Sequence, residues 1–368
     1  KVLKVPDLRF PEFTDEWERK KFRDVCNITT GNKNTQDKSN DGIYPFYVRS
    51  QIVERINSWT FDGEAILTAG DGVGVGKVFH YSTGKIGVHQ RVYILSDFKC
   101  DGKYLYSYFA GHFYNRVKRM SAKNSVDSVR MEMIADMPIS LPSTEEQKKI
   151  GHLLALLDER IATQTKIIED LKKLKSAIIE KLYSEIQGKE YSFGQLFEVV
   201  NERNKQMEYS NILSASQEKG MVNRDDLNLD IQFERSNINT YKIVMAGDYV
   251  IHLRSFQGGF AFADKLGVCS PAYTILRPNS LLEYGYLSYY FTSNRFIKSL
   301  IIVTYGIRDG RSINVEEWLN MKIAIPSKGQ QFHILKVLKS IDDKIENEEI
   351  YATCLSNQKQ YLLRQMFI

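Results

Sequence analysis

The sequence has few of the residues that build disulfide frameworks and metal sites. Its four cysteines, Cys26, Cys100, Cys269 and Cys354, lie far apart and form no CxxC pair. This spacing argues against a disulfide framework and a structural zinc site, and is typical of proteins in a reducing cytoplasm. The six histidines show no ligand spacing either. We therefore expect no metal site and a cytoplasmic protein.

Long apolar runs are also absent. No stretch approaches the roughly 18 apolar residues of a membrane-spanning helix, and the charged residues 1–13 do not resemble a secretion signal. The 368 residues, 43% of them hydrophobic, leave room for two or three folded domains. A net charge of +5 is low for a protein that binds nucleic acid only through its overall charge. Any DNA binding must therefore depend on a local arrangement of side chains or on a partner.

The motifs that resemble catalytic sites are incomplete. The glycine-rich segment 69–77 fits neither the phosphate-binding loop nor the dinucleotide fingerprint, because it reads G-x-G-x-G. Two interpretations of it stay open: a tight turn between strands, or a turn whose backbone and Lys77 approach a nucleic-acid backbone. Asp7 and Glu18 beside Lys20 have the sparse form of a nuclease site. The chain has no G-x-S-x-G elbow and no Asn-Pro-Pro-aromatic motif of adenine methyltransferases. We expect a protein without catalytic residues.

The sequence does contain an internal repeat. The segment from Pro142 to about Gln187 recurs from Pro326 onward, a shift of 184 residues, which is half the chain length. Such a period indicates a duplication. The shift also places Asp158 on Asp342 and Lys175 on Lys359.

Each copy of this segment predicts one long amphipathic helix. Ser143 with Glu146, and Ser327 with Gln330, fit the capping box that begins a helix. Apolar residues follow at spacings of three, four and seven, which is the pattern of a helix-pairing seam. The seam residues are Ile150, Leu153, Leu157, Ile161, Ile168, Leu171, Ile178 and Leu182 in the first copy, and Ile334, Leu338, Ile341, Ile345, Ala352, Leu355, Leu362 and Met366 in the second. About 40 helical residues span roughly 60 Å, enough for a spacer between two separate bodies.

The remaining segments repeat in the same order. Short apolar runs at 63–68 and 90–95 predict strands, and 104–118 predicts a helix. The segments 247–251, 271–275 and 286–291 repeat them, while the loops between do not. The predicted domains are 1–142, the helix 143–187, 188–327 and the helix 328–368. Two similar frames with different loops indicate two binding bodies with different specificities.

Polar and basic side chains on the loops are the candidates for DNA contacts. Arginine and lysine donate to guanine edges and phosphates, and glutamine pairs with adenine. The same side chains could equally be ordinary solvated ones. The candidates are Lys33, Lys77, Lys85, His89, Gln90, Arg91 and Lys123 in the first half, and Lys205, Gln217, Arg254, Gln257, Arg308 and Arg311 in the second.

Several segments together resemble the specificity subunit of type I restriction-modification systems. The opening from Pro6 to Phe13 with Trp17 is similar to the start of that family, and Leu213 to Gly220 is similar to the start of a target recognition domain. Arg254-Ser255, Gly258-Gly259-Phe260 and Ser270-Pro271-Ala272-Tyr273 match its middle, and Leu141-Pro142 with Glu145 to Ile150 matches the junction into the family's helix. The second junction departs from this pattern, with Gly329-Gln330-Gln331 replacing the acidic pair.

The resemblance implies an α+β chain with two α/β target recognition domains in pseudo-twofold arrangement, separated by two helices that form an antiparallel coiled coil. Each domain would read half of a split, asymmetric site in double-stranded DNA. Two methyltransferase subunits and restriction subunits would be the partners, and S-adenosylmethionine, ATP and Mg would belong to those partners. Two alternatives remain: a coiled-coil assembly scaffold that reads no DNA, and a nuclease that uses Asp7 and Glu18.

Overall fold

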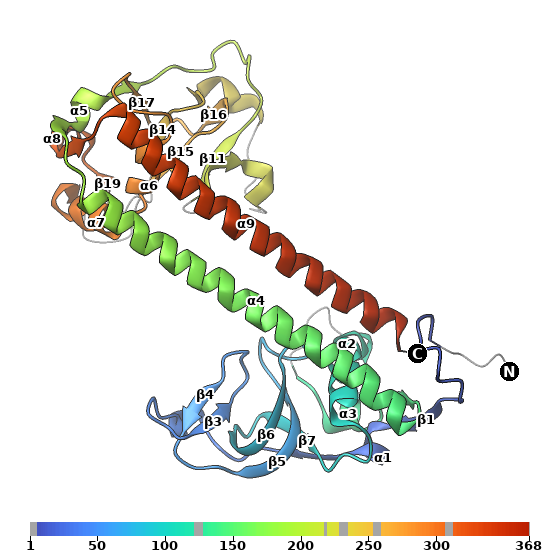
Figure 1. Cartoon of the computed structure of the whole chain (residues 1–368). Coiled ribbons are helices and arrows are strands. Elements are labelled where there is room, and N and C mark those ends of the chain that lie inside the picture. Colours follow the sequence, from blue (N-terminus) through green and yellow to red (C-terminus); the bar gives the residue numbers. More distant parts are fainter. Residues whose placement is uncertain are drawn as a thin grey trace. The chain divides into compact units, whose positions relative to one another are not determined.

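The chain folds into two compact units that each contain part of both long helices. The computed structural model describes residues 6–120, 128–216, 219–227, 235–252, 259–305 and 312–367. Unit 1 comprises residues 1–166 with 349–368, and unit 2 comprises residues 167–348. The long helices are α4 (Thr144–Ser184) and α9 (Lys328–Gln365), green and red in Figure 1. These bounds confirm both predicted helices.

Unit 1 combines a mixed sheet with short helices. Its strands are β1 (Glu18–Lys21), β2 (Asn27–Thr30), β3 (Tyr44–Tyr47), β4 (Glu54–Ile56), β5 (Phe61–Ala69), β6 (Phe79–Val88), β7 (Val92–Ser96) and β8 (Pro138–Leu141), and its helices are α1 (Phe22–Val25), η1 (Thr35–Asp37), α2 (Gly102–Met120) and α3 (Met131–Ala135). The main sheet has the order β2-β7-β5-β6-β3-β4, and β1 pairs with β8. The predicted strands at 63–68 and 90–95 and the helix at 104–118 therefore exist as β5, β7 and α2.

Unit 2 repeats this plan with shorter elements. Its strands are β9 (Lys189–Ser192), β10 (Phe197–Val200), β11 (Leu213–Ser216), β12 (Gly220–Asn223), β13 (Lys242–Val244), β14 (Tyr249–Ile251), β15 (Phe260–Phe262), β16 (Gly267–Cys269), β17 (Thr274–Pro278), β18 (Thr304–Tyr305), β19 (Ser312–Ile313) and β20 (Lys322–Ile325), and its helices are α5 (Phe193–Leu196), η2 (Arg224–Leu227), η3 (Arg235–Thr240), α6 (Tyr286–Tyr290), α7 (Asn294–Ser299), η5 (Leu300–Val303) and α8 (Val315–Asn320). The sheet order β10-β17-β14-β15 matches β2-β7-β5-β6, and the β20–β9 pair matches β8–β1. The duplication seen in the sequence is thus a duplication of topology.

The two halves differ where unit 1 has the single helix α2. In unit 2 the corresponding chain forms α6 and then α7, with a break at residues 291–293. Gly285 precedes α6 with a positive φ of 76°, a conformation that glycine adopts without strain. The Ser293 side chain accepts a hydrogen bond from the Phe296 amide at 3.2 Å and so begins the second helix.

In unit 1, α4 and α9 pack antiparallel against α2. Ile150 and Leu154, near the start of α4, share a core with Met366 and Phe367 from the end of α9. This core also contains α2 and one face of the sheet, which places α2 between the sheet and the long helices. Further along the pair, Lys359 donates to the Asp158 carboxylate.

In unit 2, the same helices pack antiparallel with their roles exchanged. Ile179 and Tyr183 of α4 share a core with Ile334 and Leu338 of α9. The ion pair in this unit joins Lys175 to Asp342. Under the 184-residue shift, this pair and the one in unit 1 are the same pair with the two helices exchanged. The predicted seam residues are buried or half-buried throughout, which fits a helix pair.

The starts of the two long helices are built differently. The Ser327 amide bonds Gln330 Oε1 at 3.3 Å and the Gln330 amide bonds Ser327 Oγ at 3.4 Å, which completes the capping box of α9. Glu146 is instead fully buried and accepts two hydrogen bonds from the Arg9 guanidinium, both at 2.8 Å. The opening segment of the chain is therefore tied to the start of α4.

Candidate nucleic-acid interface

Three loops of unit 1 bring four of the predicted DNA-binding residues together. The segment after β2 runs through Lys33, the turn before β7 contains His89, Gln90 and Arg91, and the glycine-rich turn follows β5. The first two of these loops and Arg49 line a shallow hollow of about 520 Å³ whose lining is mostly polar. Its lining residues are Asn34, Thr35, Gln36, Arg49, His89, Gln90 and Arg91.

Hydrogen bonds fix the first two loops to each other. The Gln90 amide donates to the Lys33 carbonyl at 2.8 Å, and the Gln90 side chain donates to Asn34 Oδ1 at 2.7 Å. Gly31 permits this approach, because a Cβ there would lie 2.2 Å from the Val88 carbonyl oxygen. Gln90 is exposed but oriented by its neighbour. These bonds hold the two loops in a rigid frame, which presents the Gln90 amide group and Lys33.

His89 lies beneath this surface and organises it. Its side chain is only 4% exposed. Its Nδ1 accepts from the Arg91 amide at 3.1 Å, so the neutral ring carries its proton on Nε2, which lies 3.3 Å from Thr35 Oγ1. Burial lowers the pKa of His89, and the nearby Arg49 lowers it further. The histidine is therefore a neutral support for the turn.

Asp71 holds two arginines at the edge of the hollow. Arg49 Nη1 donates to Asp71 Oδ1 at 2.8 Å, and Arg91 Nη1 binds the other carboxylate oxygen. Burial opposes ionisation of Asp71, but these two partners outweigh it and hold its pKa below the usual range. The arginine side chains remain 43% and 61% exposed. Each guanidinium is thus oriented while keeping free donors.

The glycine-rich segment is a turn clamped to the body of unit 1. A Cβ at Gly74 would lie 2.3 Å from the Arg49 carbonyl oxygen, and Gly72 and Gly76 have positive φ angles of 78° and 66°. Val75 is buried, whereas Val73 at the tip is fully exposed. Lys77 lies over the Tyr114 ring, 5.6 Å from its centroid. The tight-turn interpretation of this segment is confirmed; contact with nucleic acid stays a prediction.

The other described candidates lie apart from the hollow in sequence and contacts. Lys85, on β6, lies 5.1 Å from the centroid of the Trp59 ring. Lys205 in unit 2 is exposed in a turn after β10, next to buried Asn204, whose side chain donates to the Tyr209 carbonyl at 2.7 Å. The candidates Lys123, Gln217, Arg254, Gln257, Arg308 and Arg311 lie outside the described residues.

Other features bear on the alternatives. Glu18 forms an exposed ion pair with Lys20 at 2.9 Å. Within the described ranges, no three His, Cys, Asp or Glu side chains are grouped to hold a metal ion. No helix in the same ranges has the length and apolar character needed to cross a membrane.

The sequence alone does not indicate Asn34, Arg49 or Asp71 as site residues, because only the fold brings them beside Gln90 and Arg91.

These observations define a class of protein. It contains two copies of an α+β domain with different loops, and two long antiparallel helices that each contribute residues to both units. The family described as "Type I restriction modification DNA specificity domain" matches residues 14–173 and again 187–353. The chain belongs to this family.

Similar proteins share this description. The EcoDI specificity subunit of Escherichia coli is 29% identical over 45% of this chain, but the match spans only 37% of that subunit. The MjaVIII specificity subunit of Methanocaldococcus jannaschii is 26% identical over 92% of this chain and 88% of its own length. Among solved structures, a type I restriction-modification S subunit from M. genitalium has the same fold, with a TM-score of 0.63, 13% identity and 99% coverage of both chains.

Proposed function

We propose that this chain is the DNA-recognition subunit of a type I restriction-modification complex. Each α+β domain reads one half of a split, asymmetric DNA site, and the long helices carry the methyltransferase and restriction subunits. The chain is not itself the enzyme: methylation with S-adenosylmethionine and cleavage with ATP and Mg belong to the partner subunits. The whole complex acts in the cytoplasm, where the DNA is.

One observation carries this proposal: the family match occurs twice, and the two matches fall on the two structural repeats. Four strands have the same order in both sheets and the helix pairing is the same in both halves, while the loops differ. A conserved frame with divergent loops is what two readers of different sequences require. A solved structure described for complex assembly of the type I R-M system supports the proposal that partner subunits bind this chain. It aligns with a TM-score of 0.57 at 12% identity, over 96% of this chain and 98% of its own.

The hollow of unit 1 has chemistry suited to a DNA groove. Gln90, held by Asn34, presents an amide for bidentate pairing with adenine, and Arg49 and Arg91 present guanidinium groups for guanine or phosphate. Asp71 orients both arginines and limits the local positive charge, which favours specific contacts over general attraction to phosphate. We assign Lys33 and Lys77 to the DNA backbone.

The methylation pattern of DNA tests the proposal. Cells that express this chain with its methyltransferase partner should carry a methylated motif of two parts separated by unspecified bases. Replacing residues 28–137 by the same segment of a related subunit should change one part and leave the other. A continuous motif, or a motif that survives the replacement, would refute the proposal.

A single substitution distinguishes base contacts from phosphate contacts. If Arg91 reads a base, Arg91→Ala should cost about 1–3 kcal/mol at one position of the motif and relax specificity there. A similar loss on every sequence, with a smaller salt dependence, would identify a phosphate contact instead. Footprinting of the assembled complex tests the scaffold alternative, because a scaffold that reads no DNA protects no split site.

A further inference from the structure

Each long helix has a buried glutamine in its first turn. Gln147 of α4 is 5% exposed, and Gln331 of α9 is 1% exposed. The 184-residue shift places one on the other. A buried side-chain amide must find its hydrogen bonds within the protein, because water does not reach it. The partners of these two amides therefore show what the glutamines do.

The oxygen of each side-chain amide binds the chain just before the domain's own helix. Gln147 Oε1 accepts from the Asp101 backbone amide at 3.0 Å, and Asp101 directly precedes α2. Gln331 Oε1 accepts from the Glu283 backbone amide at 2.8 Å, shortly before α6. Each donor lies three positions before the first tyrosine of its helix, so the two bonds are equivalent in the two repeats.

The nitrogen of each side-chain amide binds the start of the long helix. Gln147 Nε2 donates to the Pro142 carbonyl at 2.8 Å, and Gln331 Nε2 donates to the Pro326 carbonyl at 3.0 Å. Gln331 Nε2 also donates to the Leu281 carbonyl at 3.0 Å. Each planar amide thus joins two separate parts of the backbone through its opposite ends. We call these two sets of bonds the glutamine joints.

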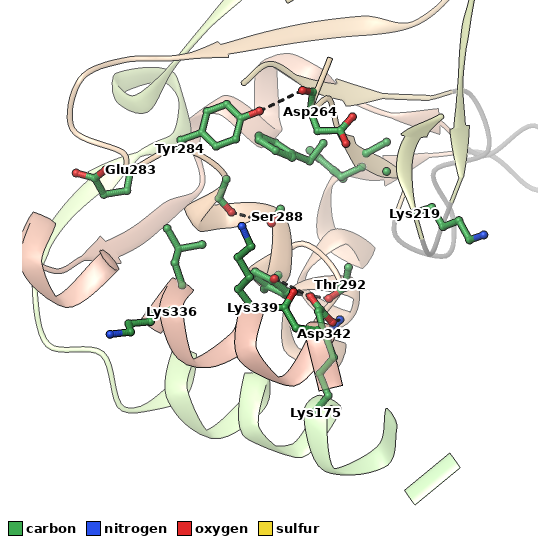
Figure 2. Close-up of a pocket in the computed structure, with 18 of the residues that line it drawn as sticks. Lys175, Lys219, Asp264, Glu283, Tyr284, Ser288, Thr292, Lys336, Lys339 and Asp342 are labelled. Carbon is green, nitrogen blue, oxygen red and sulfur yellow. Dashed lines mark hydrogen bonds and ion pairs between the residues drawn. The ribbon is translucent and has the colours of Figure 1, made fainter. Parts of the chain in front are cut away.

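Other contacts beside the glutamine joints differ between the repeats. In unit 1, α4 lies so close to α2 that a Cβ at Gly151 would lie 2.7 Å from the Tyr104 amide nitrogen. In unit 2, Lys328 donates to the Leu282 carbonyl at 2.9 Å and forms an ion pair with Glu283 at 3.1 Å. Figure 2 shows Glu283 on the chain above α9. The glutamine joints are thus the part of this attachment that both repeats share.

The domain helix transmits the position of each joint to the sheet. In unit 1, Phe109 of α2 packs edge-on against Phe79 of β6, with ring centroids 5.4 Å apart. In unit 2, the Tyr249 hydroxyl of β14 accepts from the Leu287 amide of α6 at 3.1 Å. Protein interiors are close-packed, so helix and sheet move together. A tilt of α2 on α4 therefore moves the loops of the unit 1 hollow relative to α4.

The angle of each domain on its long helix matters because the two parts of a split site lie on a helical duplex. One extra base pair between them moves the second part by about 3.4 Å along the DNA axis and turns it by about 35°. Both α4 and α9 contribute residues to both units. Domains fixed on these helices can meet both parts at one spacing only, whereas loosely held domains can follow the change.

We propose that Gln147 and Gln331 are positioning residues that fix the number of unspecified base pairs between the two parts of the DNA site. To bind a site with one pair more or fewer, the chain must tilt a domain and break a glutamine joint. The lost hydrogen bonds then oppose binding at the wrong spacing. A chain without the glutamine has no such bonds to break. This inference rests on the proposed function and identifies which residues make the spacing strict.

Methylation of a spacing series tests the proposal on the full chain in complex with its methyltransferase partner. Oligonucleotides present the two parts of the wild-type motif at the natural spacing and with one base pair more or fewer. Gln147→Met and Gln331→Met keep a side chain of similar length and remove its hydrogen bonds. In each variant, the ratio of kcat/KM between natural and altered spacing should fall about 10-fold, the equivalent of one buried hydrogen bond. The bases required in each part should stay the same.

A matched variant separates positioning from stability. Ile94 lies in the core cluster formed by β3, β5, β6 and β7, apart from α2. Ile94→Val should lower the melting temperature, as Gln147→Met does, and leave the spacing ratio unchanged. If a methionine variant does not fold, Gln147→Glu or Gln331→Glu replaces it. The carboxylate keeps the bond from the backbone amide and loses the bond to the proline carbonyl, so the ratio should fall at least about threefold.

The outcomes distinguish this inference from the function on which it rests. A continuous motif in the wild-type complex would refute both. A wild-type complex that methylates a split site equally at several spacings would refute the inference alone. So would folded glutamine variants that keep the full spacing ratio. An equal fall of the ratio in Ile94→Val would also overturn the inference, because it would assign the change to lost stability.

Discussion

The two repeat-related ion pairs of the long helices should differ in their contribution to stability. Asp158 is joined to Lys359 in unit 1, and Asp342 to Lys175 in unit 2. Asp342 alone also accepts a hydrogen bond from the Tyr289 hydroxyl, at 2.7 Å. In unit 1 the position of Tyr289 is taken by a serine, so this extra bond exists in one copy only.

The contribution of each aspartate to the free energy of unfolding follows from the exposure of its side chain to solvent. The side chains of Asp158 and Asp342 are 36% and 37% exposed, so solvent screens each ion pair to about 0.5 kcal/mol. A hydrogen bond from a half-buried hydroxyl to a charged carboxylate adds about 1 kcal/mol. We therefore expect Asp158→Ala to cost about 0.5 kcal/mol and Asp342→Ala about 1.5 kcal/mol. In the background Tyr289→Phe, the cost of Asp342→Ala should fall to about 0.5 kcal/mol.

Tryptophan fluorescence during urea unfolding measures each unit separately. The chain has three tryptophans: Trp17 and Trp59 in unit 1, and the fully buried Trp318 in unit 2. Replacing the first two by phenylalanine leaves a reporter of unit 2, and replacing Trp318 leaves reporters of unit 1. Equal costs for the two aspartate substitutions, or a cost at Asp342 that is unaffected by Tyr289→Phe, would refute the reasoning.

Three further predictions concern the hollow of unit 1. Asp71→Asn should release the two arginines, lower the stability of unit 1 by about 1 kcal/mol and raise affinity for non-specific DNA; filter binding on random sequence checks this, and unchanged affinity would contradict it. His89 has a lowered pKa when folded, so the unfolded state binds the proton more tightly, and unit 1 should lose stability as the pH falls below about 6.5. His89→Gln should flatten that pH dependence in urea titrations from pH 7.5 to 5.5, and an unchanged slope would exclude His89 as its cause. Gly74→Ala should destabilise unit 1 by about 2 kcal/mol in the same assay, because its Cβ would overlap the Arg49 carbonyl; a neutral result would mean that the turn yields easily.

Local patterns in the chain were enough to predict the regular elements of the fold. The capping residues and the three-four-seven spacing predicted α4 and α9 within a few residues, because helix periodicity depends on near neighbours. The 184-residue shift predicted a duplicated fold, and the four strands that follow the same order in both sheets confirm it. The break between α6 and α7 was not predicted, since residues 286–291 match the start of α2 and the change comes only at Ser293.

The candidate site was predicted less completely. Gln90 and Arg91 were selected from the sequence by residue type, but Asn34 and Asp71, which hold them from other loops, were not. Arg49, which shares Asp71 with Arg91, was not selected either. His89 was chosen as a surface contact, yet the fold buries it and uses both ring nitrogens internally. Residue type indicates what a side chain can bind, whereas its neighbours determine what remains free to bind.

The sequence by itself determined the duplication, the two long helices and the family, because each of these depends on order and spacing along the chain. Only the tertiary structure decided which side chains of each half meet. The 184-residue shift places Gln147 on Gln331. The partners of these two side chains, Asp101 and Glu283, lie 46 and 48 positions away along the chain. Packing joins such distant residues, so no local pattern contains the contact.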